Sequence, residues 1–156
     1  MKTKCLIGLL LLCAVLSGCV STNRVAIRKD NEGVYGYRLK NVSVIFEFDR
    51  ANYEYVTSDE SGVFAKIEDV NIRQVCVAGE FNSWARDKWI MQKVGKDRFR
   101  FEKRVSEFGS KPEWQFKFVI NGSYWVEPPT DAVNRIPTGF MNNSFNLVLR
   151  LKGLST

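Results

Sequence analysis

The sequence predicts an all-β protein built as a sandwich of antiparallel strands. Short segments rich in β-branched and aromatic residues alternate between apolar and polar positions, which is the pattern of half-buried strands. Clusters of turn-forming residues separate these segments at fairly even spacing, which is typical of a two-sheet sandwich. No segment carries the apolar period of an amphipathic helix. These three observations favour a single β domain with one core.

The expected strands follow one another in chain order. Residues 42–48 alternate toward their end, and residues 53–57 and 63–67 flank the turn-rich stretch 58–62, which predicts a hairpin. A buried apolar strand follows at residues 75–79, and residues 98–101 and 144–151 alternate between apolar and polar positions. We therefore expect a shared core that contains Phe99, Phe101, Phe116, Phe118, Phe145, Leu147 and Leu149.

The strand at residues 114–120 is expected to end in a hairpin. Its alternation places Trp114, Phe116, Phe118 and Ile120 toward the core and Lys117 on the solvated face. Asn121-Gly122 is a strong signal for a two-residue turn, because both central residues of that turn need a positive φ.

The length of this hairpin loop decides which aromatic residue shares the face of Lys117. A two-residue loop puts Tyr124 on that face and Trp125 in the core. A longer or bulged loop reverses the assignment. The two-residue loop is the favoured interpretation, and the alternative stays open.

The N-terminus is expected to be a targeting signal that is not part of the folded domain. Lys2 and Lys4 precede an apolar run over residues 6–16, and Leu16-Ser17-Gly18-Cys19 resembles the lipobox of bacterial lipoproteins. The resemblance implies a signal peptide at residues 1–18 and an acylated Cys19 that anchors the protein to a membrane of the bacterial cell envelope. No acidic residue follows Cys19, which favours the outer membrane in a Gram-negative cell. Residues 19–40 are expected to form a tether and residues 41–156 the β domain.

Cysteine content and charge exclude several functions. Cys5 and Cys13 leave with the signal, so Cys76 is the remaining thiol of the domain, and its apolar strand indicates a structural role. The sequence contains no histidine to activate a catalytic thiol. The formal net charge of +6 falls by two when Lys2 and Lys4 are removed, and the basic residues form no dense cluster. Nucleic acid is therefore not an expected partner.

Two motifs carry a family resemblance. Residues 75–84, VCVAGEFNSW, run from a strand into a turn with a tryptophan, and residues 114–122, WQFKFVING, place one lysine among aromatic residues before a hairpin. Over residues 72–151, about half of the chain, the sequence resembles the glycogen- and starch-binding early-set domains. These are immunoglobulin-like sandwiches found in the β-subunit of AMP-activated protein kinase and at the N-termini of glycogen branching enzymes.

The resemblance implies a set of sugar-contacting residues. Matched motif by motif, they are Trp84, Lys117, Tyr124 or Trp125, and Asn142. Aromatic rings pack on the C–H faces of a sugar, and amide and ammonium groups bond its hydroxyls. Each also has a structural alternative: Trp84 as a loop-packing residue, Lys117 as a solubilising one. The chain departs from the family in an insert at residues 49–71, which extends the sheet, covers the site or binds a partner.

The expected function is noncatalytic. Glycoside hydrolysis needs two carboxylates across one bond, and no such pair is evident in the sequence. Metal-binding patterns are absent from the sequence as well, and no cofactor is expected. Two functions remain: a membrane-anchored module that binds α-glucan, such as glycogen, starch or maltodextrin, or a scaffold of the same fold that docks a protein, for example a glycan-processing enzyme.

Overall fold

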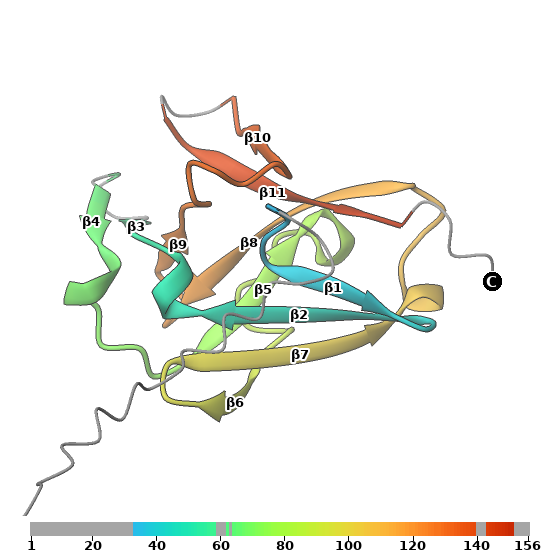
Figure 1. Ribbon diagram of the computed structural model, residues 1–156, viewed down its shortest axis with the longest axis horizontal. Coiled ribbons are helices and arrows are strands. Elements are labelled where there is room, and N and C mark those ends of the chain that lie inside the picture. The colour runs from blue at the N-terminus through green and yellow to red at the C-terminus, as the bar shows by residue number, and fades with distance from the viewer. Residues whose placement is uncertain (1–32, 59–61, 63, 140–142, 152–156) are drawn as a thin grey trace, which may run out of the picture.

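The computed structural model describes residues 33–58, 62, 64–139 and 143–151, and these form two antiparallel sheets (Figure 1). The first sheet has the strand order β1-β2-β7-β6. The second has the order β10-β11-β8-β9-β3-β4. In it, β11 and β9 pair with one edge of β8, and β5 pairs with the opposite edge. The prediction of an all-β fold with antiparallel sheets is therefore confirmed. The strands are β1 (Tyr37–Lys40), β2 (Ser43–Asp49), β3 (Tyr55–Ser58), β4 (Phe64–Lys66), β5 (Val75–Gly79), β6 (Gln92–Gly95), β7 (Arg98–Arg104), β8 (Glu113–Ile120), β9 (Tyr124–Val126), β10 (Arg135–Pro137) and β11 (Phe145–Arg150).

Single turns of 3-10 helix connect some of these strands. Their bounds are η1 (Arg50–Asn52), η2 (Ile67–Asp69), η3 (Glu80–Asn82) and η4 (Val105–Glu107). Among the described residues, no helix is long and apolar enough to cross a membrane.

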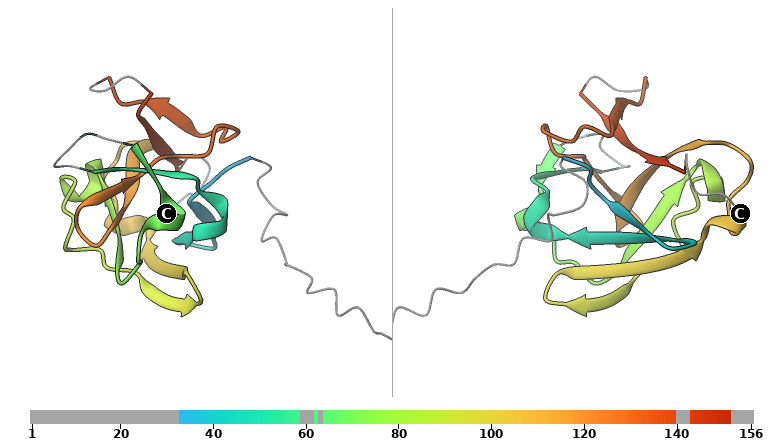
Figure 2. Two further views of the ribbon diagram at one scale, coloured as in Figure 1. Left: turned by 90° about the vertical axis from the view of Figure 1, so that its left-hand side faces the viewer. Right: turned by 45° about the vertical axis from the view of Figure 1, so that its right-hand side comes forward.

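The core lies between the two sheets, which are seen as separate layers in the right-hand view of Figure 2. Phe46 and Phe48 of β2 meet Phe116 and Phe118 of β8 edge to face, with ring centroids 5.2 Å and 5.5 Å apart. Such contacts between aromatic rings add to the free energy gained by removing apolar surface from water.

Most of the predicted core residues are buried, and two are not. Phe99, Phe116, Phe118, Leu147 and Leu149 are each at most 3% exposed. Phe101 is half-buried and packs on the edge of the core.

The prediction for Phe145 is wrong. Its half-buried ring lies under the guanidinium group of Arg135, at 4.5 Å. The pairing of β11 with β8 begins only at Leu147, so Phe145 stands before the stretch of β11 that is joined to β8.

The fold begins before residue 41, so the predicted tether is too long. Tyr37–Lys40 forms β1 and pairs with β2 along its full length. Before it, the backbone N–H of Tyr35 donates to Asn134 Oδ1 at 3.0 Å. The side chains of β1 are at most half-buried, so its sequence shows no sustained alternation of apolar and polar residues.

The insert at residues 49–71 extends the second sheet. The predicted hairpin is confirmed as β3 and β4, and β3 also pairs with β9. Tyr53 is buried and its ring stacks on Phe48, with centroids 5.3 Å apart. The insert is therefore joined both to the sheet and to the core.

One edge of β8 changes partner along its length. Glu113–Phe116 pairs with β11, and Val119 and Ile120 pair with β9 on the same side, opposite β5. Between these two stretches lies Lys117. We call this place the fork of the sheet, since β9 and β11 separate there.

Candidate carbohydrate-binding face

The β8–β9 hairpin has a three-residue loop. Asn121 and Gly122 both have positive φ values, 52° and 74°, and Ser123 N–H donates to Ile120 O at 3.1 Å, as the Asn-Gly signal predicted. Pairing nevertheless resumes at Ile120 with Tyr124 and Val119 with Trp125, which leaves Ser123 as an extra residue. The favoured two-residue loop is thus wrong by one residue, and a slip of one residue reverses the faces.

Contacts from the side chain of Asn121 hold the loop in this form. Its Oδ1 accepts the backbone N–H groups of Arg73 and Gln74 at 3.0 Å and 3.2 Å. Its Nδ2 donates to Asn71 O at 2.8 Å. The asparagine therefore joins the hairpin to the segment that enters β5.

The reversed register brings Trp125 and Trp84 together on the outer face of the second sheet. Their ring centroids are 6.2 Å apart at an interplanar angle of 63°. Both rings are half-buried and pack over Cys76, Ala78 and Val119, which are at most 1% exposed. We call Trp84 and Trp125 the tryptophan pair.

The turn after β5 carries Trp84 to this face. Asn82 Oδ1 accepts Gly79 N–H at 2.9 Å, and its Nδ2 donates to Val77 O at 2.9 Å. Ser83 and Trp84 then adopt the left-handed backbone conformation, with φ values of 55° and 57°.

Two other residues of the turn motif, Gly79 and Phe81, lie on the side of the sheet that faces the core. A Cβ atom on Gly79 would lie 2.6 Å from Gln115 O, so the close approach of β5 and β8 requires glycine here. Phe81 turns to the core and stacks on Trp89, with centroids 4.5 Å apart. The motif thus separates an inward phenylalanine from an outward tryptophan, and Trp89 packs against the core.

Arg86 completes the face, and no motif in the sequence had indicated it. Its guanidinium carbon lies 5.8 Å from the ring centroid of Trp125, within the range of a cation–π contact. Its Nη1 donates to Gly122 O at 3.3 Å. Arg86 therefore ties the Trp84 loop to the hairpin that carries Trp125.

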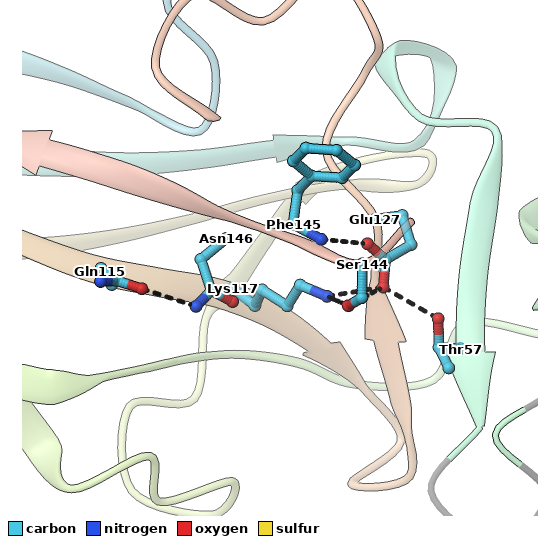
Figure 3. A network of polar contacts seen from close by, with 7 residues as sticks. All are labelled: Thr57, Gln115, Lys117, Glu127, Ser144, Phe145 and Asn146. Atoms are coloured by element: carbon cyan, nitrogen blue, oxygen red, sulfur yellow. Dashed lines mark hydrogen bonds and ion pairs between the residues drawn. The ribbon is translucent and has the colours of Figure 1, made fainter. Parts of the chain in front are cut away.

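Lys117 lies on the predicted face but not in solvent. Its side chain is 5% exposed, and its Nζ lies 2.6 Å from Glu127 Oε1 and 2.9 Å from Ser144 Oγ (Figure 3). The prediction that the ammonium emerges on the solvated surface is therefore wrong. Burial lowers the pKa of Lys117 from its ordinary value, and the charge and hydrogen bond of Glu127 oppose that change.

Glu127 is the centre of this polar network. Its Oε1 also accepts the hydroxyl groups of Thr57 at 2.9 Å and Ser144 at 3.1 Å, and its Oε2 accepts Phe145 N–H at 3.0 Å (Figure 3). The carboxylate thus accepts hydrogen bonds from groups of β3, β8 and β11. These bonds satisfy the polar groups that are buried in the fork. Beside the network, Asn146 Nδ2 donates to Gln115 Oε1 at 2.8 Å.

The hairpin register also accounts for the ion pair. With Val119 opposite Trp125, continuing two residues along each strand places Lys117 opposite Glu127. In the two-residue register the lysine does not face this glutamate. The sequence signal for the pair was therefore present, but it depends on the loop length.

The remaining predicted residues fall elsewhere. Tyr124 turns inward and packs on the edge of the core. Asn142 and Cys19 lie outside the described residues.

Cys76 is buried, as its apolar strand indicated. Its thiol donates to Arg86 O at 2.8 Å. Burial, and secondarily the charge of Asp87, raises the pKa of this thiol to about 12.

Within the described part of the chain, no group of three or more His, Cys, Asp or Glu side chains is placed to hold a metal ion. No protein-family model and no curated protein sequence matches this chain, so the resemblance to glycogen-binding domains rests on the sequence motifs alone.

Proposed function

We propose that this protein is a noncatalytic carbohydrate-binding module that recognises α-glucan and is anchored to the bacterial cell envelope through an acylated Cys19. The observation that carries the proposal is the tryptophan pair on the outer face of the second sheet. The C–H faces of a sugar pack on aromatic rings, and a tryptophan offers the largest ring for this contact.

Polar groups around the pair suit the rim of a sugar. The guanidinium group of Arg86 lies beside Trp125 and carries donors for hydroxyl groups. The half-buried amide of Gln115 lies on the same sheet, toward the fork, and the buried Asn146 holds it in place. Because both rings are already half-buried, the contact area is small, and we expect dissociation constants in the range of about micromolar to millimolar.

A pull-down on insoluble starch or glycogen tests the proposal. The full chain is solubilised in a detergent without a sugar headgroup, which would otherwise compete for the site. We expect it to sediment with the polysaccharide and to be released by maltoheptaose. Trp84→Ala is expected to stay in the supernatant, since an aromatic anchor commonly carries a large share of binding energy.

A protein-docking scaffold is the second candidate, and the burial of Lys117 favours it. The ammonium that the resemblance assigns to sugar binding is engaged with Glu127, so the face offers one cation fewer to a ligand. If the full chain shows no binding to any α-glucan at millimolar concentration, the scaffold is the better account, with a protein such as a glycan-processing enzyme as partner.

A further inference from the structure

Two aromatic residues of the insert share the face of the tryptophan pair. Thr57 is paired with Trp125 on one side and with Phe64 on the other, so these three residues form one row across β9, β3 and β4. Residues paired in this way point to the same face of a sheet. Val56 and Ala65 point to the opposite face, where they pack in or against the core.

Tyr55 lies in the next row of the same face. It is two residues before Thr57 on β3, and it pairs with Lys66 of β4. Tyr55 and Phe64 are therefore diagonal neighbours, and their side chains are 40% and 38% exposed. We call them the insert pair.

Thr57 separates the two pairs. It is 5% exposed and its hydroxyl donates to Glu127, so it offers little surface of its own, and Trp125 and Phe64 flank it in the row. Two strand spacings separate these residues, which places their backbones about 10 Å apart. The aromatic rings thus stand at two places along one face, with the small side chain of Thr57 between them.

We propose that the insert pair is a second contact for the sugar chain, so that the face binds an α-glucan of several units rather than a single sugar or a chain end. This inference rests on the proposed function. A ligand that reaches from Trp125 to Phe64 is longer than one sugar ring. Its C–H faces meet rings at both ends, and the stretch between them crosses Thr57.

A long, narrow ligand fits this arrangement better than a protein surface does. The centre of a protein–protein interface is its most apolar and best-packed part. Here the centre is the small Thr57, which is 5% exposed and offers little contact area, and the rings lie at its two sides. Lys66 lies beside Tyr55 at the β4 end of this face and forms an exposed ion pair with Glu68; the two side chains are 58% and 69% exposed. Its ammonium can donate hydrogen bonds to the hydroxyl groups of a sugar.

The test is the dependence of affinity on chain length. Binding of maltotriose and maltoheptaose to the full chain is measured by titration calorimetry for wild type and for the double variant Tyr55→Ala/Phe64→Ala. We expect the affinity of the variant for maltoheptaose to be about tenfold lower, because one aromatic contact with the sugar is lost. Its affinity for maltotriose is expected to change less than about twofold.

Two control variants separate the contact from an effect on the fold. Tyr55→Phe keeps the ring and is expected to bind maltoheptaose as wild type does. Val94→Ala removes a side chain that is 48% exposed on β6 of the other sheet, and it is expected to change neither affinity. Thermal melting of each variant shows whether the β3–β4 hairpin is retained.

The outcomes are distinguishable. If wild type binds both sugars and the double variant keeps its maltoheptaose affinity, or loses affinity for both sugars equally, the second contact is excluded and the proposed function stands. If wild type binds neither sugar, the proposed function fails and the inference fails with it.

Discussion

Lys117 and Glu127 face each other across the β8–β9 hairpin and form an ion pair, Nζ to Oε1 2.6 Å, whose side chains are 5% and 7% exposed. The pair lies where β9 and β11 separate from the edge of β8, and the carboxylate also binds the backbone N–H of Phe145. An ion pair in such a place is costly to break, because removing one partner leaves the other charge buried without compensation.

We therefore predict that Lys117→Met lowers the free energy of unfolding by about 3–5 kcal/mol. The double variant Lys117→Met/Glu127→Gln removes both charges and keeps an oxygen for Phe145 N–H, so it is expected to recover at least half of that loss. Equilibrium unfolding in urea measures both values.

The matched control is an exposed pair on the same sheet. Arg150 and Glu113 lie 3.3 Å apart with side chains 47% and 45% exposed. Arg150→Ala is expected to cost less than about 1 kcal/mol, because solvent screens such a pair. Equal losses for Lys117→Met and Arg150→Ala would contradict the structural role of the buried pair.

The thiol of Cys76 predicts a loss of stability in alkali. Its pKa is raised from 9.0 to about 12 in the folded protein. Above pH 9 the unfolded chain releases this proton and the folded chain keeps it, so the free energy of unfolding falls as pH rises, by at most about 1.4 kcal/mol per pH unit.

Cys76→Ala isolates this contribution. Other groups, such as the buried Tyr53 with its raised pKa, titrate in both proteins, so the difference between wild type and variant reports the thiol. Urea unfolding at pH 8, 9, 10 and 11 is expected to give a shallower decline for the variant. Parallel curves would mean that the thiol does not resist ionisation in the fold.

Two phenylalanines test the assignment of the core. Phe118 is fully buried, and Phe118→Ala is expected to cost roughly 3–5 kcal/mol. Phe145 is half-buried beside Arg135, and Phe145→Ala is expected to cost clearly less. Urea unfolding of both variants measures the difference, and a Phe145 variant as unstable as the Phe118 variant would place Phe145 in the core after all.

The anchor is tested separately, at Cys19. The Leu16-Ser17-Gly18-Cys19 motif predicts that Cys19→Ala releases the protein from membranes or leaves it unprocessed. Metabolic labelling with a fatty acid and fractionation of the envelope measure this. Unchanged labelling and sedimentation in the variant would show that another residue holds the protein at the membrane.

The alternation of the strands predicted most of the fold, because burial of one face of a sheet imposes a period of two on the residues themselves. Phe116, Phe118, Leu147 and Leu149 were assigned to the core on this ground and are buried there. The same rule failed at Phe145, where the alternation continues but β11 is not paired with β8.

The candidate site depends on contacts that a local pattern does not contain. Asn121 bonds the backbone of Arg73 and Gln74, far away in the sequence, and the hairpin that carries it has a loop of three residues. That one residue moves Trp125 to the outer face and places Glu127 opposite Lys117. The two errors in the predicted site therefore have a single origin.

We propose that Trp125, and not Tyr124, belongs to the face that binds α-glucan. Titration calorimetry of maltoheptaose against Trp125→Ala and Tyr124→Ala, with thermal melting of both variants, distinguishes the two residues. We predict that Trp125→Ala loses detectable binding at millimolar sugar, whereas Tyr124→Ala binds as wild type does and melts at a lower temperature. Wild-type affinity in Trp125→Ala, or no binding by the wild-type protein itself, would show that Trp125 does not bind the sugar.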